Sequence, residues 1–228
     1  MLDTELLKKS YSEIFKIQIK RPGADELLKW LEENDFFTAP ASSRYHLAIP
    51  GGLLQHSLNV YYRLCALTGT FTGDILSDEV LDANPDCDES TLLPHESIAI
   101  VSLLHDICKV NMYKPAQRNQ KTYDKAKVEA ADKNLIKHDS LGDYIWETVL
   151  NYEIKDDFIF GHGEKSVYLI NKFMKLKDEE AQAIRYHMSS WKHDDIQNVG
   201  KVYAANPLAF FLHVADEMAT YLDEADGR

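Results

Sequence analysis

An all-α fold, built as a helical bundle with a small β-hairpin insertion, is what this sequence of 228 residues predicts. Three observations indicate it. Apolar residues recur at spacings of three and four along most of the chain, proline and glycine separate these stretches, and only one short segment alternates like a strand. No internal repeat, low-complexity tract or clear linker interrupts the chain, so we expect a single domain over residues 1–228.

Residues 1–44 are predicted to form two helices and the start of a loop. Tyr11 and Phe15 share one face of a helix over 2–18, and Pro22 separates it from a second helix over 24–34. Prolines, serines and paired glycines mark residues 36–52 as a loop. Further helices are predicted over residues 53–68, 94–109, 165–175, 178–191 and 206–224.

Three segments between these helices have a different character. Residues 69–93 contain seven acidic and no basic residues, which predicts a solvated acidic loop. Residues 110–137 contain seven basic and three acidic residues, and we interpret them as an irregular lid that attracts an anionic substrate. The alternation of Tyr144, Trp146 and Thr148, followed by apolar residues up to Phe160, predicts a β-hairpin within 144–160.

The composition excludes some partners and compartments. The formal net charge of −12 argues against broad binding of nucleic acid or of anionic lipid, since both need a positive surface. The three cysteines form no CxxC pair, which is typical of a reducing compartment. No signal-type segment opens the chain, and no stretch approaches the roughly 18 apolar residues of a membrane span, so we expect a cytoplasmic protein.

Residues able to bind a metal occupy core positions on three predicted helices. His56 lies on the apolar face of its helix, His105 and Asp106 end a second apolar run, and Asp216 faces inward on a third. A lone histidine in such a place is usually a packed core residue. Three helices that each bury an imidazole or a carboxylate are harder to explain by packing, because burial of these groups is costly unless a partner or cation compensates.

This series of His56, His105-Asp106 and Asp216 resembles the HD superfamily of metal-dependent phosphohydrolases. The resemblance covers about residues 45–222, preceded by N-terminal helices over 1–44. One position departs from the pattern, because many family members have glycine where this chain has Cys108. The matching blocks are Pro50-Gly-Gly-Leu-Leu-Gln-His56, His105-Asp-Ile-Cys-Lys109, Gly161-His-Gly-Glu-Lys-Ser166 and Ala215-Asp216-Glu-Met-Ala219.

The resemblance implies a site for divalent transition metals. In family members with two ions, two histidines between the His-Asp pair and the last aspartate complete the second ion's shell, and Asp106 would bridge the ions. We expect two ions here, with a single ion as the alternative. Imidazole and carboxylate donors suit manganese, iron, zinc or nickel, and magnesium stays open. The implied ligands are His56, His105, Asp106, His162, His187 and Asp216.

The resemblance also implies hydrolysis of a phosphoester by water that the metal activates. Asp106 and Lys109 are the predicted catalytic residues, and Lys109, His46 and Arg185 are the predicted substrate contacts. The expected substrate is a small, nucleotide-like phosphate compound or a phosphodiester. A nucleic acid would bind only as a substrate. Two alternatives stay open: a non-catalytic, nucleotide-binding regulatory module, and a dinuclear-iron oxygenase on the same fold.

Three other histidines are predicted to lie outside the metal shell. His138-Asp139 repeats the dipeptide in a polar segment, which favours a surface pair. His213 precedes Asp216 by three positions and is interpreted as packing or as support for the site. His193 lies in a charged stretch that is predicted to be a solvated turn.

Overall fold

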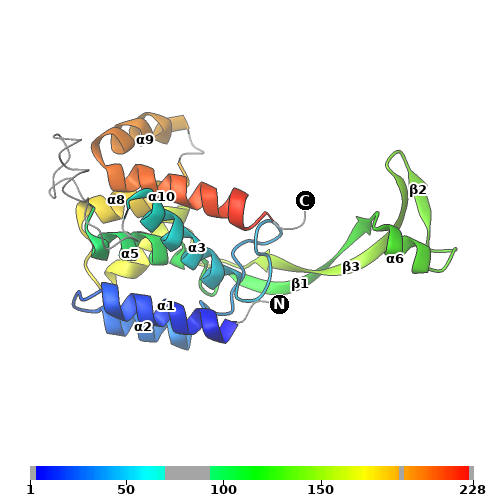
Figure 1. Cartoon of the computed structure of the whole chain (residues 1–228), viewed down its shortest axis with the longest axis horizontal. Helices are drawn as coiled ribbons and strands as arrows, with labels where there is room; N and C mark the ends of the chain where they lie inside the picture. Colours follow the sequence, from blue (N-terminus) through cyan, green and yellow to red (C-terminus); the bar gives the residue numbers. More distant parts are fainter. Residues whose placement is uncertain (1–3, 70–92, 190–192, 226–228) are drawn as a thin grey trace.

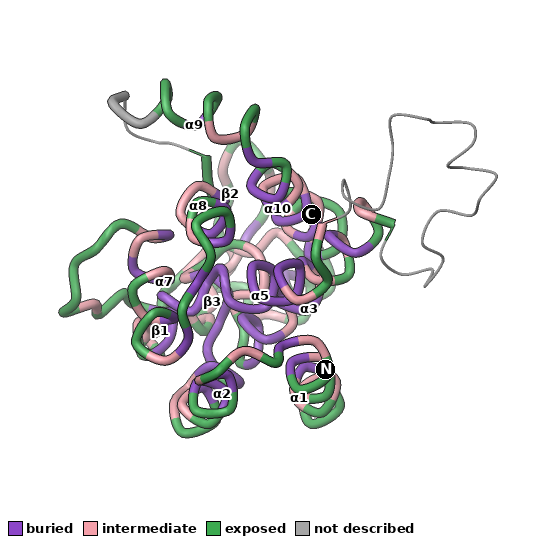
Figure 2. The backbone as a smooth tube through the Cα atoms, turned by 90° about the vertical axis from the view of Figure 1, so that its left-hand side faces the viewer, coloured by how far each residue is buried: buried purple, intermediate pink, exposed green. Residues whose placement is uncertain are grey.

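The computed structural model describes residues 4–69, 93–189 and 193–225, and its main body is a bundle of helices. Two helices lie at its centre, α3 (Gly52–Leu67) and α5 (His95–Leu104), and Figure 2 shows how much of both is buried. The last eight residues of α5 are all buried, as expected for a helix that is apolar all round. This central pair is covered by α1 (Thr4–Gln18) and α10 (Pro207–Met218).

The N-terminal helices belong to the same core as the predicted metal-binding region. Tyr11 of α1 is fully buried, and its hydroxyl donates a hydrogen bond to the carbonyl oxygen of Leu103 at 3.1 Å. Buried residues from α1 to α10 form one hydrophobic cluster, which also includes residues of the other helices. Those helices are α2 (Ala24–Glu33), α7 (His162–Asn171) and α8 (Asp178–Tyr186).

A long β-hairpin arm projects from the bundle (Figure 1). Strand β1 (Tyr113–Thr122) pairs antiparallel with β3 (Gly142–Ile154), and β2 (Lys137–Asp139) pairs with the tip end of β3. The short helix α6 (Lys125–Ala130) lies in the connection between β1 and β2. At the base of the arm, the backbone N–H of Tyr152 donates to the carbonyl oxygen of Ser43 at 3.2 Å, which ties β3 to the loop before α3.

The hairpin was predicted, but its strands differ from the expected ones. Residues 142–154 form one continuous strand, and its partner is residues 113–122, inside the segment interpreted as an irregular lid. The sequence of β1 has no valine, isoleucine, phenylalanine or tryptophan, so its composition does not predict a strand. The antiparallel pairing with β3 stabilises this strand instead. The segment interpreted as a lid extends away from the helical bundle. Two of its lysines form ion pairs within the arm, Lys121 with Asp139 and Lys127 with Glu147.

Most predicted helices are confirmed, with changes at their ends. The α-helical part of α5 ends at Leu104, and a turn leads into the 3₁₀-helix η3 (Ile107–Lys109). Where a turn was predicted around His193, the structure has the helix α9 (His193–Ala205), whose apolar pattern is weak in the sequence. The predicted helix 206–224 changes after α10 into the π-helix η4 (Ala219–Asp223).

Two further expectations concern the chain outside the core. The acidic loop predicted over residues 69–93 lies almost entirely outside the described residues. Among the helices that the structure does describe, none combines the length and the apolar character needed to cross a membrane.

Candidate metal centre

The loop before α3 brings two histidines together. Gly52 begins α3 at a point where a side chain has no room, because a Cβ atom there would lie 2.1 Å from the carbonyl oxygen of Leu47. That carbonyl also accepts a hydrogen bond from the N–H of Ala41 at 3.1 Å, which folds the loop back toward α3. The imidazole of His46 consequently lies with its ring centre 5.1 Å from that of His56.

Two histidines occupy the same kind of position, one residue past the end of a helix. His105 follows α5 and His187 follows α8, and both are fully buried. The Nδ1 atom of His105 lies 2.8 Å from the carbonyl oxygen of Ser102, and that of His187 lies 2.6 Å from the carbonyl oxygen of Ile184. Carbonyls in the last helical turn lack helical partners, so each accepts the Nδ1–H of the histidine. This leaves Nε2 of both rings with a lone pair that faces the site.

The start of α7 brings a further histidine, His162, to the site. His162 is the first residue of this helix, and Gly163 follows it. A Cβ atom at Gly163 would lie 2.4 Å from the carbonyl oxygen of Arg185, so only glycine lets α7 pack this closely against the end of α8. The close packing places the His162 and His187 rings with their centres 5.4 Å apart.

The C-terminal part of the chain supplies two carboxylates. Asp216 lies on the buried face of α10, and its Oδ1 atom is 3.2 Å from Nε2 of His56. Glu224 follows the π-helix, whose longer turn is closed by a hydrogen bond from its N–H to the carbonyl oxygen of Ala219 at 3.0 Å. The Glu224 carboxylate accepts hydrogen bonds from Nδ1 of His56 at 3.0 Å and from the Asn59 amide at 2.9 Å.

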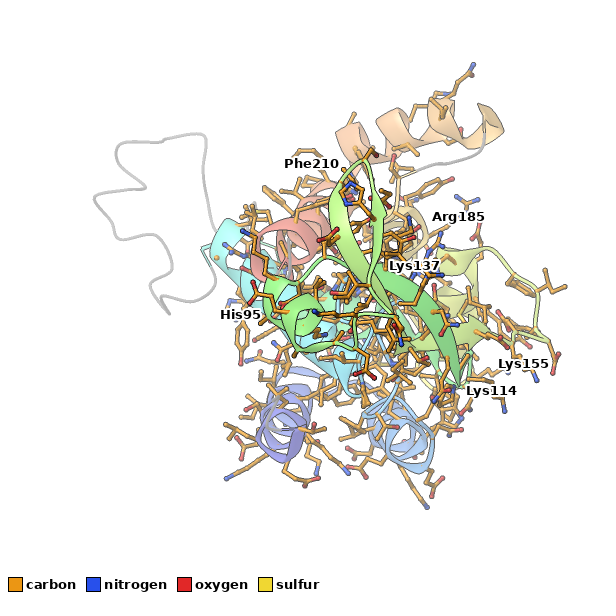
Figure 3. All side chains as sticks on the ribbon, turned by 90° about the vertical axis from the view of Figure 1, so that its right-hand side faces the viewer. His95, Lys114, Lys137, Lys155, Arg185 and Phe210 are labelled. Carbon is orange, nitrogen blue, oxygen red and sulfur yellow. The ribbon has the colours of Figure 1, made fainter. Side chains whose placement is uncertain are left out.

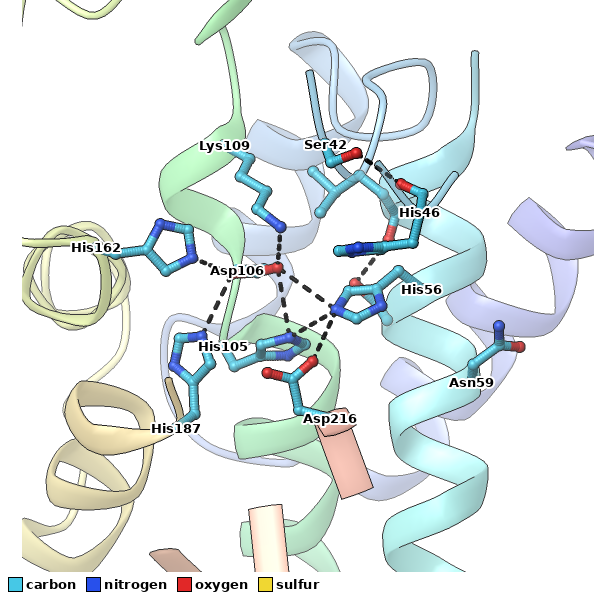
Figure 4. Close-up of polar contacts among 12 residues, drawn as sticks. Ser42, His46, His56, Asn59, His105, Asp106, Lys109, His162, His187 and Asp216 are labelled. Carbon is cyan, nitrogen blue, oxygen red and sulfur yellow. Dashed lines mark hydrogen bonds and ion pairs between the residues drawn. The ribbon is translucent and has the colours of Figure 1, made fainter. Parts of the chain in front are cut away.

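Asp106 lies at the centre of these side chains, and its two oxygens face different partners (Figure 4). Its Oδ1 atom is 2.6 Å from Nε2 of His162 and 3.5 Å from Nε2 of His187. Its Oδ2 atom is 3.5 Å from Nε2 of His56 and 3.5 Å from Nε2 of His105. A carboxylate placed between two pairs of imidazoles is suited to bridge two cations.

One acceptor among the implied ligands is left without a donor. Nε2 of His187 is buried and makes no hydrogen bond within the described part of the chain. Nε2 of His105 lies 3.3 Å from Nε2 of His56, although His105 already uses Nδ1 as its donor. Leaving a buried polar atom unpaired costs roughly 1–3 kcal/mol, and a cation would satisfy these lone pairs together. The donor set therefore fits a metal ion.

Among the residues that the structure describes, four overlapping groups of donor atoms lie close enough to share an ion. Within each group, the donor atoms all lie within 4.8 Å of one another. All six ligands implied by the sequence belong to at least one group. The groups are His56-His105-Asp216, His105-Asp106-His187, Asp106-Cys108-His162 and His46-His56-Glu224.

The protonation of the cluster follows from burial and neighbouring charges. Burial lowers the pKa of His105 to about 4, so its imidazole is neutral near pH 7. Burial acts against protonation of His56 too, but Asp216 and Glu224 raise its pKa to about 10. Burial alone would raise the pKa of Asp106, yet the nearby Lys109 ammonium holds that pKa well below its ordinary value. Asp106 is therefore an ionised carboxylate with the Lys109 ammonium beside it.

The three predicted substrate contacts lie in different places. Lys109 is buried, and its Nζ is 2.5 Å from Oδ2 of Asp106, at the centre of the cluster. His46 lies at the edge, where its side chain is 20% exposed and its Nε2 is 3.9 Å from Glu224. Arg185 lies at the periphery of the body (Figure 3), where it pairs with Glu164 at 2.8 Å and lines a groove between α7 and α8. The contacts support the proximity of Lys109 and His46 to the site but not that of Arg185.

Sequence reasoning missed the role of Glu224 and treated Cys108 only as a departure from the family pattern. Glu224 lies eight residues after Asp216, a separation that turns an ordinary α-helix by about 80° and so points to another face. The π-helix, which the sequence did not reveal, places both carboxylates beside His56. The Sγ atom of Cys108 lies 3.3 Å from Nδ1 of His162.

Two of the histidines predicted to lie outside the metal shell, His138 and His213, lie as predicted. His138 is exposed on the arm and pairs with Asp143 at 2.8 Å, so the second His-Asp dipeptide is a surface feature. His213 supports the site through its Nδ1, which lies 2.7 Å from the carbonyl oxygen of His187.

No protein-family model matches this chain, and no curated protein or solved structure is significantly similar to it. The function of the site therefore has to be inferred from its own residues.

Proposed function

We propose that this protein is a metal-dependent phosphohydrolase of the HD type, which cleaves a phosphoester in a nucleotide-like compound or a phosphodiester. The observation that carries the proposal is the position of Asp106, whose two oxygens face two separate pairs of imidazoles. The order of these residues along the chain, which resembles that of the HD superfamily, supports the same conclusion.

The residues present would hold two ions. His56, His105, Asp106 and Asp216 would bind the first, and Asp106, His162 and His187 the second. Divalent transition metals suit these nitrogen and oxygen donors, and when bound they polarise water and a phosphoryl oxygen. Hydrogen bonds to Nδ1 fix the orientation of three of the imidazoles, as is common for metal-bound histidines.

Lys109 gives the site a preference for an anionic substrate. Its ammonium is buried beside Asp106, whose charge raises the lysine pKa despite the opposing effect of burial, so the group stays charged at neutral pH. A phosphate oxygen that approached the cluster would find this donor next to the implied ligands. In the proposed reaction, Lys109 donates a hydrogen bond to that oxygen and offsets the charge that develops on it.

The test measures bound metal and phosphate release with two matched double variants. His105→Ala/Asp106→Ala removes the central dipeptide, and His138→Ala/Asp139→Ala removes the same dipeptide from the exposed arm. Metal analysis of the purified proteins is followed by assays on nucleotides and on cyclic and linear diesters with manganese, iron, nickel, zinc and magnesium. We expect the first variant to lose bound metal and activity, and the second to keep both.

The possible outcomes separate the proposal from its alternatives. Unchanged metal stoichiometry in a folded His105→Ala/Asp106→Ala variant would overturn the assignment of the site. Metal binding without phosphate release from any substrate class would favour a regulatory module. Bound iron with oxygen consumption and no phosphate release would favour a dinuclear-iron oxygenase.

A further inference from the structure

Cys108 lies against the side of the cluster that includes His162. It belongs to η3, is 1% exposed, and its Sγ atom is 3.3 Å from Nδ1 and 3.6 Å from Nε2 of the His162 imidazole. The same imidazole contacts Oδ1 of Asp106 at 2.6 Å. A thiol, an imidazole and a carboxylate therefore meet at one place, where their donor atoms lie within 4.8 Å of one another.

The surroundings of Cys108 differ from those of the other buried cysteine. Cys65 on α3 is 2% exposed and forms part of the hydrophobic cluster of the core, which is the usual setting of a packed thiol. Cys108 is equally buried but lies outside that cluster. Its backbone N–H donates to the Ser166 hydroxyl at 3.1 Å, which fixes η3 against α7.

A second observation at the same carboxylate oxygen points to a ligand. Nε2 of the fully buried His187 lies 3.5 Å from Oδ1 of Asp106 and has no hydrogen-bond partner in the described chain. The oxygen that contacts His162, whose ring lies against Cys108, is thus also faced by an unsatisfied imidazole nitrogen. A cation shared by these side chains would satisfy that nitrogen and bind the thiol next to His162.

We propose that Cys108 is a thiolate ligand of the second ion, together with Asp106, His162 and His187. This inference rests on the proposed metal centre and makes its second position a site for a thiophilic metal. Thiolates favour zinc, ferrous iron or cobalt over magnesium and manganese. Binding releases the thiol proton to solvent, because the thiolate is the form that coordinates.

Cobalt(II) tests the inference, because a sulfur–cobalt bond produces a near-ultraviolet charge-transfer band that nitrogen and oxygen ligands do not. The chelator-treated protein is titrated with cobalt(II) without oxygen, and the absorbance and bound metal are measured together. We expect the band in the wild type and its loss in Cys108→Ser. The matched control, Cys65→Ser/Cys87→Ser, should keep the band, since it retains only Cys108. The Cys108→Ser change should also lower zinc affinity by about tenfold or more while changing manganese affinity little.

The outcomes distinguish this inference from the function on which it rests. Cobalt bound by the wild type without the band would overturn the Cys108 assignment and leave the metal centre intact. A band that persists in Cys108→Ser would overturn the assignment as well. If no cobalt or other divalent metal binds at all, the metal centre itself is wrong. If Cys108→Ser fails to fold, the spectrum of Cys65→Ser/Cys87→Ser decides the question, because Cys108 is its only cysteine.

Discussion

Two clusters of charged side chains in this protein differ in how completely their buried atoms are paired. The first, which we call the Arg21 cluster, consists of Arg21, Glu96, Ser97 and Glu180, and joins the start of α2 to α5 and α8. Glu180 is fully buried, yet both of its oxygens are satisfied. One accepts from Arg21 at 2.9 Å and Ser97 at 2.7 Å, and the other from Arg21 at 2.6 Å and the backbone N–H of Lys177 at 2.8 Å.

The second cluster, at the candidate metal centre, is buried and incompletely paired. Its carboxylates have partners: Lys109 pairs with Asp106, and His56, whose pKa is raised to about 10, contacts Asp216 and Glu224. His187 Nε2 has no partner there. Glu180 in the Arg21 cluster is fully paired by protein groups, whereas the candidate metal centre leaves a buried nitrogen that a cation could satisfy.

Burial and charge do not by themselves identify a functional site. Buried polar groups in folded proteins are almost always hydrogen-bonded, so the exceptions are informative. Two of the three buried unpaired side-chain atoms in the described residues belong to histidines of the metal-centre groups, His46 and His187, and the third is Oδ1 of Asn151 in the arm. An unpaired atom within a group of potential metal donors is the observation that indicates a ligand.

The largest expected difference between the clusters is in their response to metal. Metal that binds only the folded state raises the free energy of unfolding by about 4 kcal/mol at a thousandfold excess over Kd. We expect a rise of this size for the wild type and for Glu180→Gln, but none for Asp106→Asn. Urea unfolding with and without manganese or zinc measures it. A metal-dependent rise in Asp106→Asn equal to that of the wild type would contradict the comparison.

Glu224 offers a smaller test of how the metal centre is supported. Its carboxylate holds Nδ1 of His56, and loss of such a partner typically lowers metal affinity by about 10–100-fold. We expect this loss for Glu224→Gln. Asp223→Asn is the matched control, because the neighbouring Asp223 pairs with Arg63 at the surface. Competition with a chromogenic chelator measures both affinities, and equal values would show that Glu224 only packs against His56.

Much of this arrangement could be predicted from the sequence because apolar periodicity reports the buried face of a helix. The helices that carry His56, His105 and Asp216 were located in this way, and each of these side chains lies at its expected inward position. Family resemblance then supplied the order of ligands, and the structure brings all six side chains together. Whether they bind metal stays a prediction.

The remaining features depend on contacts that a single sequence does not encode locally. β1 is a strand because β3 pairs with it, not because its own side chains favour one. Glu224 reaches His56 only because the helix changes pitch after Met218. Arg185 lies only two residues before His187 in the sequence. Side chains two residues apart at the end of α8 point in different directions, so Arg185 pairs with Glu164 at the surface.

The smallest expected effect concerns the pH dependence of the Arg21 cluster. Burial would raise the pKa of Glu180, but hydrogen bonds from Arg21 and Lys177 outweigh it and lower the pKa below its ordinary value. A carboxyl with a lowered folded-state pKa contributes stability above its unfolded pKa of about 4.3, and this contribution is lost as the pH falls through the folded value.

Between pH 6 and pH 3, in about the range where carboxyl groups titrate, the wild type should therefore lose more stability than Glu180→Gln. The size of this difference reports how far the folded protein lowers the pKa of Glu180. Urea unfolding of both proteins in chelator measures it without a contribution from bound metal. Glu13→Gln removes a carboxylate from an exposed pair with Lys9 and should follow the wild-type curve, because such pairs contribute little. Parallel pH curves for the wild type and Glu180→Gln would mean that an ionised Glu180 does not stabilise the Arg21 cluster. The difference between this cluster and the candidate metal centre would then rest on hydrogen bonding alone.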